Sequence, residues 1–150
     1  CFVEDTLAIL KEYDFPPSQL WIEITERCRD LPISMIKKTV TAFREAGIHI
    51  TMDDYGTGSS SSQMMLELPV EGIKIDMFFV KDILEEKKKQ ALVIGMINFA
   101  NAADLKICIE GIENDSLESY LRQFDVTCFQ GYHYSRPICQ DELMKLLIKP

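Results

Sequence analysis

Two adjacent aspartates, Asp53 and Asp54, stand at the end of an apolar segment and directly before a glycine-rich one that contains Gly56 and Gly58. Neighbouring side chains of a β-strand point to opposite faces, so both carboxylates can face one ligand only where the strand ends and its backbone turns. The two glycines permit such a turn. Because hard divalent cations prefer carboxylate oxygens, the pair predicts a metal site. Taken alone, the segment can also be an ordinary Asp-Gly turn.

Other polar residues take the same position after the other apolar segments. Glu23 and Glu26 close the first, Asp53 and Asp54 the second, Lys74 and Asp76 the third, Glu110 and Glu113 the fourth, and Gln130 the fifth. A single strand-end glutamate is usually a solvated surface residue. Parallel strands place their carboxyl ends on one face, however, so we expect Glu23, Asp53, Asp54, Lys74, Glu110 and Gln130 to meet at one end of a sheet. Five successive strands with this pattern favour catalysis.

Strand and helix patterns alternate along the chain. Strand patterns cover residues 20–24, 48–52, 72–75, 105–109 and 126–129. Helix patterns cover the first ten residues, the segment capped at Asp30 and ended by Gly47, residues 80–102, the segment capped at Asn114 and ended near Leu121, and residues 141–147. In the third of these we expect Leu84, Ala91, Leu92, Met96 and Phe99 to face inward. The alternation predicts one α/β domain with a parallel sheet.

Composition narrows the range of partners and compartments. The net charge of -8 argues against binding duplex nucleic acid, so a phosphorylated ligand would need metal ions between the two negative partners. Five cysteines without a Cys-x-x-Cys pair fit a reducing cytoplasm better than a disulfide framework. We interpret His49 and His133 as structural or surface residues. No signal peptide and no apolar run of about 20 residues is visible.

Five motifs, in order and with matching spacing, resemble the EAL domain family, which hydrolyses the bacterial second messenger cyclic di-GMP. They are Glu23-Ile24-Thr25-Glu26, the segment from Asp53 to Gly58, Lys74-Ile75-Asp76, Glu110-Gly111-Ile112-Glu113 and Gln130-Gly131-Tyr132, with Ser135-Arg136-Pro137 after them. The resemblance covers the chain from Leu20 to Pro137. Each motif alone is weak evidence, whereas five in register are specific.

The resemblance implies a TIM-like (β/α) barrel with two Mg²⁺ or Mn²⁺ ions. By similarity, Glu23 and Asp53 bind the first metal ion, and Asp54 binds the second together with Asp53. Lys74 holds the attacking water, and Glu110 is the general base or completes the metal shell. Around them, Glu26 fixes the loop after Asp54, Gln130 lines the site, and Glu113 supports residues that bind the metal. From the residues alone, Lys74 has an alternative role as the ion-pair partner of a strand-end carboxylate.

The resemblance also implies that the barrel is incomplete. In the family, a Glu-Ala-Leu strand and a strand with a metal-binding Asn precede the equivalent of residues 20–24, but only 19 residues precede Leu20 here. Residues 1–150 therefore resemble about the last three-fifths of the domain, without two ligands of the first metal and with open sheet edges that could pair with another copy or exchange strands.

The expected function follows from the family. We expect a metal-dependent cyclic di-GMP phosphodiesterase that forms linear pGpG, with this truncated chain inactive alone. The alternative is a noncatalytic module that binds cyclic di-GMP or a protein, and a barrel enzyme of unrelated chemistry is a third reading. We expect a cytoplasmic domain. The sequence leaves open whether a GGDEF domain, a sensor domain or a membrane-anchoring segment lies upstream.

Overall fold

A parallel sheet forms the centre of the molecule. The computed structural model describes residues 2–25, 31–57 and 61–148, without the side chains of residues 61 and 62. Within these residues the strands are β1 (Trp21–Thr25), β2 (His49–Tyr55), β3 (Gly72–Ile75), β4 (Lys106–Ile109) and β5 (Cys128–Phe129). All neighbours pair in parallel, in the order β1-β2-β3-β4-β5. The predicted strands and the α/β class are confirmed.

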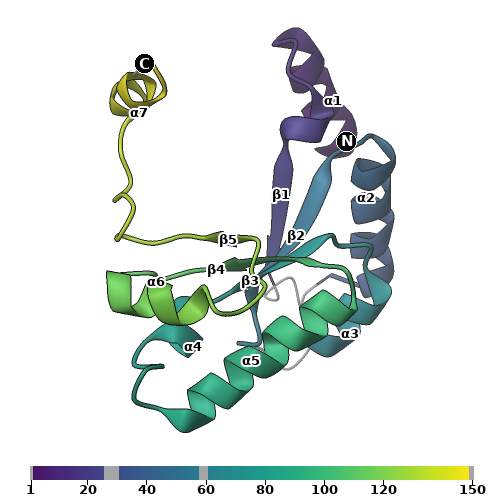
Figure 1. Cartoon of the computed structure of the whole chain (residues 1–150). Helices are drawn as coiled ribbons and strands as arrows, with labels where there is room; N and C mark the ends of the chain where they lie inside the picture. Colours follow the sequence, from purple (N-terminus) through teal and green to yellow (C-terminus); the bar gives the residue numbers. More distant parts are fainter. Residues whose placement is uncertain (1, 26–30, 58–60, 149–150) are drawn as a thin grey trace.

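Helices connect successive strands. They are α1 (Phe2–Glu12), the short 3-10 helix η1 (Pro17–Gln19), α2 (Ile33–Glu45), α3 (Ser61–Glu67), α4 (Met77–Val80), α5 (Lys87–Ala102), α6 (Asp115–Leu121) and α7 (Gln140–Leu147). Figure 1 shows α2, α3 and α5 beside the sheet, whereas α7 stands apart from it after an extended segment. None of the described helices has the length and apolar character that crossing a bilayer requires.

Local signals set several helix ends where the sequence predicts them. Gly47 follows α2 with a φ of 85°, the left-handed conformation in which helices commonly end. The Asn114 side chain accepts a hydrogen bond of 3.0 Å from the backbone N–H of Leu117 and so caps α6. Pro32 is the N-cap residue of α2, and the predicted cap at Asp30 lies outside the described residues.

The core lies on one face of the sheet. Its strand residues alternate with polar ones and are at most 1% exposed: Ile50, Met52, Ile73, Ile75, Ile107 and Ile109. Val93 and Ile97 of α5 and Leu117 and Leu121 of α6 belong to the same buried cluster as all of these except Ile50, which packs with Val40 and Phe43 of α2 in a second cluster. Successive side chains of a strand point to opposite faces, so these apolar residues, which alternate with others along each strand, all lie on one face.

The predicted helix over residues 80–102 is wrong in its first turns. Helix α4 ends at Val80, Asp82 has a φ of 59°, and α5 begins only at Lys87. Because this turn interrupts the helix, inward-facing positions counted at helical spacing from Val80 do not match those of α5, and the prediction selects the wrong face. The buried residues of α5 are Val93, Ile97 and Ala100; Leu84, Ala91, Leu92 and Phe99 are exposed, and Met96 is half-buried against the core.

Candidate functional site

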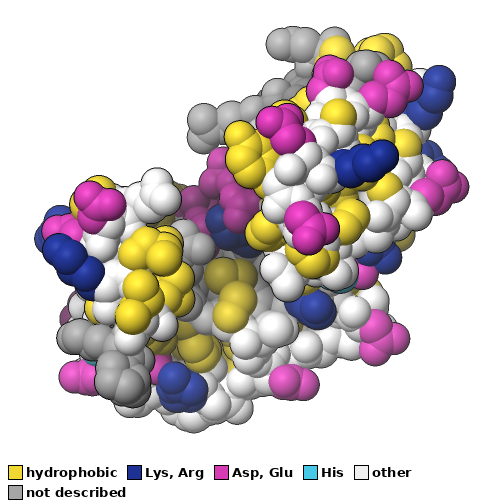
Figure 2. All heavy atoms as spheres, turned by 90° about the horizontal axis from the view of Figure 1, so that it is seen from above, with side chains coloured by type: hydrophobic (Ala, Val, Ile, Leu, Met, Phe, Trp, Pro, Cys, Tyr) yellow, Lys and Arg dark blue, Asp and Glu magenta, His cyan; other side chains and the backbone are white. Residues whose placement is uncertain are grey.

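The Lys74 side chain lies among three carboxylates at the carboxyl ends of the strands. Its Nζ is 2.7 Å from Glu110 Oε1, 2.9 Å from Glu23 Oε1 and 3.3 Å from Asp53 Oδ1. The Lys74 side chain is only 10% exposed. Figure 2 shows acidic side chains next to a basic one within the hollow of the molecule. The expected convergence is therefore observed for Glu23, Asp53, Lys74 and Glu110.

Strand register brings these residues together. Thr25, two residues after Glu23, pairs with Asp53, and Lys74 pairs with Cys108, two residues before Glu110. Residues two apart on a strand share a face, so the cluster lies on the face opposite the core. The same strands therefore carry the core on one side and this cluster on the other.

A bulge in β2 allows both aspartates to leave the core face. Met52 pairs with Ile73 but Tyr55 pairs with Ile75, so β2 holds one more residue than β3 between these pairs. Met52 and Tyr55 both belong to the buried core although they are three residues apart, and Asp53 and Asp54 between them are half-buried. Two residues of a bulged strand oppose one residue of its partner.

The sequence analysis placed the turn too late. We expected the strand to end near Met52 and Gly56 and Gly58 to turn the chain, but β2 continues to Tyr55. The residue with the unusual backbone is Asp54 itself, with a φ of 53°. Aspartate is among the few residues that adopt this left-handed conformation readily, so the motif supplies both a carboxylate and a bulge.

Two glycines of the motifs are required by close packing around the site. Gly56 has a φ of 93°, and a Cβ there would lie 2.5 Å from Met96 Cε and 3.2 Å from Phe79 Cζ. Gly111, which follows Glu110, has a φ of 75°, and its Cβ would lie 2.4 Å from the Cβ of Met77. A larger residue at Gly111 would displace Met77, and at both positions the positive φ disfavours any residue other than glycine.

The charges of the cluster do not balance. Burial alone would lower the pKa of Lys74, but hydrogen bonds to Glu110 and Glu23 and the charges of Glu110 and Asp53 outweigh it, so its pKa lies well above the usual value. Three carboxylates face this one ammonium, which leaves an excess of two negative charges. Such a set of oxygen donors fits hard divalent cations such as Mg²⁺ and Mn²⁺.

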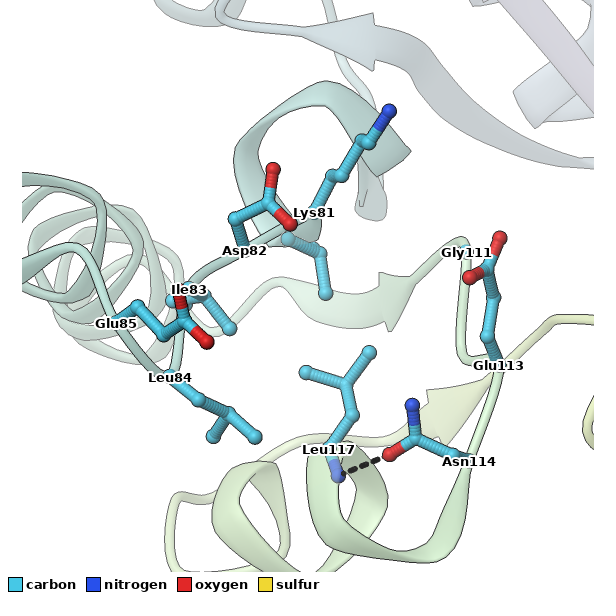
Figure 3. Close-up of a pocket in the computed structure, with 10 residues that line it drawn as sticks. Lys81, Asp82, Ile83, Leu84, Glu85, Gly111, Glu113, Asn114 and Leu117 are labelled. Atoms are coloured by element: carbon cyan, nitrogen blue, oxygen red, sulfur yellow. Dashed lines mark hydrogen bonds between the residues drawn. The ribbon is translucent and has the colours of Figure 1, made fainter.

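Gln130 lies in the same hollow, and Glu113 does not. Gln130 lines a pocket of about 360 Å³ together with Glu23 and Lys74. Glu113 is exposed and lines a separate pocket of about 230 Å³ with Asn114 and the segment 80–85 (Figure 3). The structure thus places Glu113 away from the Lys74 cluster. Glu26 lies outside the described residues.

A second group of metal-binding residue types is explained by ion pairs. His133 Nε2 is 3.0 Å from Glu118 Oε2 and 3.4 Å from Asp115 Oδ1, and the potential ligand atoms of all three lie within 4.8 Å of one another. Glu118 is also paired with Arg122, whose hydrogen bond lowers the pKa of this carboxyl group. The Asp115 side chain is 94% exposed, so we interpret the group as a surface ion-pair network.

The sequence analysis missed the rest of the polar face. Thr51 is 7% exposed, and the Trp21 ring stacks on His49 at 4.5 Å with Lys106 Nζ 4.7 Å from its centroid. Cys108 lies next to Lys74, and burial raises the pKa of its thiol to about 12. The sequence contained a signal for them, because these residues precede the strand-end residues by two or four positions. Side chains at that spacing on a strand lie on the same face.

Comparisons with known proteins identify the family to which the chain is similar. The family model of the EAL domain matches residues 1–137. The cyclic di-GMP phosphodiesterase RocR of Pseudomonas aeruginosa is 30% identical over 142 residues, which is 94% of this chain and 36% of RocR. The chain spans between 16% and 36% of the length of the curated relatives that it matches.

Two solved structures show the same similarity in three dimensions. The EAL domain of Mycobacterium smegmatis DcpA superposes with a TM-score of 0.92 at 32% identity, over 97% of this chain and 66% of that one. The manganese and cyclic di-GMP complex of Klebsiella pneumoniae BlrP1 superposes with a TM-score of 0.83 at 28% identity, over 90% of this chain and 34% of that one. The shared fold is TIM-barrel-like.

Proposed function

Because this chain belongs to the EAL domain family, we propose that it supplies part of the active site of a cyclic di-GMP phosphodiesterase that uses two Mg²⁺ or Mn²⁺ ions. The observation that carries the proposal is the cluster of Glu23, Asp53 and Glu110 around Lys74, with its excess of negative charge. RocR is a cyclic di-GMP phosphodiesterase, and the BlrP1 structure contains manganese and cyclic di-GMP, so both support this reading.

The metal ligands in this proposal are Glu23, Asp53, Asp54 and Glu110. Their oxygens belong to the ligand class that Mg²⁺ and Mn²⁺ prefer. Bound there, the two ions would offset the negative charge of a phosphodiester and lower the pKa of a water molecule. The bulge between Met52 and Tyr55 supports the assignment of Asp53 and Asp54, since it removes both aspartates from the core.

Lys74 and Glu110 are the proposed catalytic residues. The raised pKa of Lys74 keeps its ammonium charged, so it can orient the attacking water and offset charge that develops on the phosphate. The Glu110 side chain is 18% exposed, and its Oε1 lies 2.7 Å from Lys74 Nζ. The ammonium of Lys74 and the carboxylate of Glu110 are therefore close enough to contact the same water molecule, whose proton Glu110 can accept. Gln130 lines the hollow in which substrate would lie.

The proposed active unit is larger than this chain. The chain covers 66% of the DcpA EAL chain, and β1 and β5 each pair with one neighbour among the described strands. We therefore expect cyclic di-GMP turnover by the isolated chain to be much slower than turnover by a complete domain. Equal rates of pGpG formation by the two would show that the chain is sufficient.

Replacing Glu110 with Gln in the complete domain tests the mechanism. We expect kcat to fall by about 10²- to 10⁴-fold, the usual contribution of a general base, because Gln keeps the size but cannot accept the proton. The Kd for cyclic di-GMP, measured in Ca²⁺, should change little. Glu45→Gln, at an exposed position of α2, is the matched control.

Each alternative has its own outcome. An unchanged kcat in Glu110→Gln would remove Glu110 from the mechanism, and a large loss of affinity would make it a substrate-binding residue. Tight cyclic di-GMP binding by the wild-type complete domain without turnover in Mg²⁺ or Mn²⁺ would support the noncatalytic module instead.

A further inference from the structure

Two cysteines lie side by side on the polar face of the sheet, next to the Lys74 cluster. Cys108 of β4 pairs in register with Cys128 of β5, so their side chains project from adjacent strands to the same side. Both residues line the hollow that also contains Glu23 and Lys74. The chain therefore holds a dithiol at the edge of its candidate active site.

The dithiol is open to small solutes. Cys128 is exposed on the short edge strand β5, and Cys108 is half-buried behind it. The hollow of about 360 Å³ gives a small ion access to both sulfur atoms. Cys139 is also exposed, but it lies ten residues beyond β5 at the start of α7 and takes no part in the pair.

The spacing of the strands favours a bridging atom over a direct disulfide. Adjacent parallel strands are about 4.8 Å apart, and paired side chains on one face leave the sheet in parallel, so their Cβ atoms keep roughly this separation. A disulfide requires a Cβ–Cβ separation of about 3.5–4.5 Å. By contrast, two metal–sulfur bonds of about 2.3 Å each allow a sulfur–sulfur separation of up to roughly 4.6 Å, which side chains that leave the sheet in parallel can keep. One ion thus fits between the sulfur atoms without bringing the strands together.

We propose that Cys108 and Cys128 form a binding site for a soft monovalent metal ion such as Cu(I). Thiolate sulfur selects soft ions of this kind. The reaction forms two Cu–Sγ bonds, breaks two S–H bonds and releases two protons to solvent, with no change of oxidation state. The product carries one negative charge and lies beside the Lys74 cluster, whose three carboxylates already outnumber its one ammonium.

Occupation of this site has a consequence for the active site. It places a negative complex in the hollow beside Lys74, where the phosphodiester would lie, and so should inhibit turnover. The binding itself stands independently, whereas this inhibition rests on the proposed phosphodiesterase function. A measurement of binding therefore separates the two proposals.

Anaerobic titration of the purified chain with Cu(I), against a chromogenic Cu(I) chelator, tests the site. We expect one ion per chain and an affinity that falls by at least about 100-fold in Cys108→Ser and in Cys128→Ser, since changes outside the first ligands already cost 10–100-fold. Cys139→Ser is the matched control and should bind as the wild type does. Circular dichroism verifies that each variant remains folded.

Mapping the protected thiols identifies the ligands. Cu(I) should protect Cys108 and Cys128 from alkylation by N-ethylmaleimide and leave Cys139 reactive. Protection of other cysteines, wild-type affinity in Cys128→Ser, or an ion that joins two chains would overturn the proposal. In the complete domain, Cu(I) should slow cyclic di-GMP turnover in the wild type and not in Cys128→Ser. If binding fails while turnover is intact, only the dithiol site is rejected.

Discussion

The two faces of the sheet differ sharply although the same strands form both. On the core face, Ile73, Ile75 and Ile109 are at most 1% exposed and pack against helices. Lys74, which lies between Ile73 and Ile75 in the sequence, points to the opposite face and contacts Glu110 and two further carboxylates. Burial of apolar area stabilises the first face, whereas crowded like charges destabilise the second. The core face thus stabilises a site that is unfavourable by itself.

The β2 bulge is where the division between the faces is adjusted. Without it, strict alternation would return Asp54 to the core side after Asp53. The extra residue keeps Tyr55 in the core, where its ring stacks on Phe99 of α5 at 6.3 Å between centroids. The site gains a second carboxylate and the core loses no aromatic residue.

The largest effect should come from Lys74→Met on the polar face of a complete domain. Loss of the positioned cation should lower kcat by about 10³-fold, or roughly 4 kcal/mol in the activation barrier. The carboxylates left behind are between 18% and 47% exposed, so solvent can screen their repulsion and stability should fall less than activity. Lys88→Met, exposed on α5, is the control.

The pH dependence of the same cluster sharpens this test. The pKa of Lys74 is raised above the usual lysine value of 10.5 by its carboxylate partners, so the charged form persists from neutral pH to above that value. Its favourable interactions are fully present below pH 10.5 and are lost only as pH rises through the higher folded pKa. Turnover in the wild type should therefore show no loss from Lys74 deprotonation between pH 6 and about 9.

The next effect should come from Ile109→Ala on the core face. This residue is 0% exposed and immediately precedes Glu110, so its truncation leaves a cavity behind the site. We expect the free energy of unfolding to fall by about 3 kcal/mol, measured from the urea midpoint with an unchanged m-value. The folded fraction should keep its Mn²⁺ affinity. If Lys74→Met destabilises the chain more than Ile109→Ala does, the proposed division between the two faces is wrong.

A smaller effect should separate the backbone of the bulge from its carboxylate. Asp54→Gly and Asp54→Ala both remove the carboxylate, so both should weaken Mn²⁺ binding. They differ in the cost of a φ of 53°, which glycine adopts freely and alanine does not. We expect Asp54→Ala to be less stable than Asp54→Gly by about 1 kcal/mol in chemical denaturation. Equal stability would mean that the bulge changes its conformation in the variants.

The smallest effect should come from an ion-pair network at the amino-terminal ends of β2 and β3, far from the Lys74 end of the strands. Glu71 Oε2 lies 2.5 Å from both Arg44 and His49. Burial alone would raise the pKa of Glu71, but the hydrogen bond of His49 and the charge of Arg44 outweigh it and lower the pKa. The resulting stability is present above pH 4.5 and is lost as pH falls through the lower folded pKa.

Glu71→Gln should accordingly reduce the free energy of unfolding by at most about 1 kcal/mol at pH 7, since partly exposed pairs contribute little. The difference from the wild type should vanish at low pH, where both side chains are neutral. A difference that grows on acidification would contradict the lowered pKa of Glu71.

Features that depend on neighbouring residues were determined by the sequence alone. Short apolar segments between helix patterns located the strands, Gly47 and Asn114 set two helix ends, and the order of the motifs identified the family. These signals are local because a short apolar run, a capping side chain and a left-handed glycine each act within a few residues. The grouping of Glu23, Asp53, Lys74 and Glu110 also followed, because parallel strands share their carboxyl end.

Only the tertiary structure decided what depends on register and phase. The turn at Asp82 changed the inward face of α5, and the bulge at Asp54, rather than the following glycines, removed both aspartates from the core. Cys108 and Cys128 are neighbours because β4 and β5 align at these residues, twenty positions apart in sequence. A shift of one residue in either strand would turn one thiol to the other face, and no local pattern fixes that alignment.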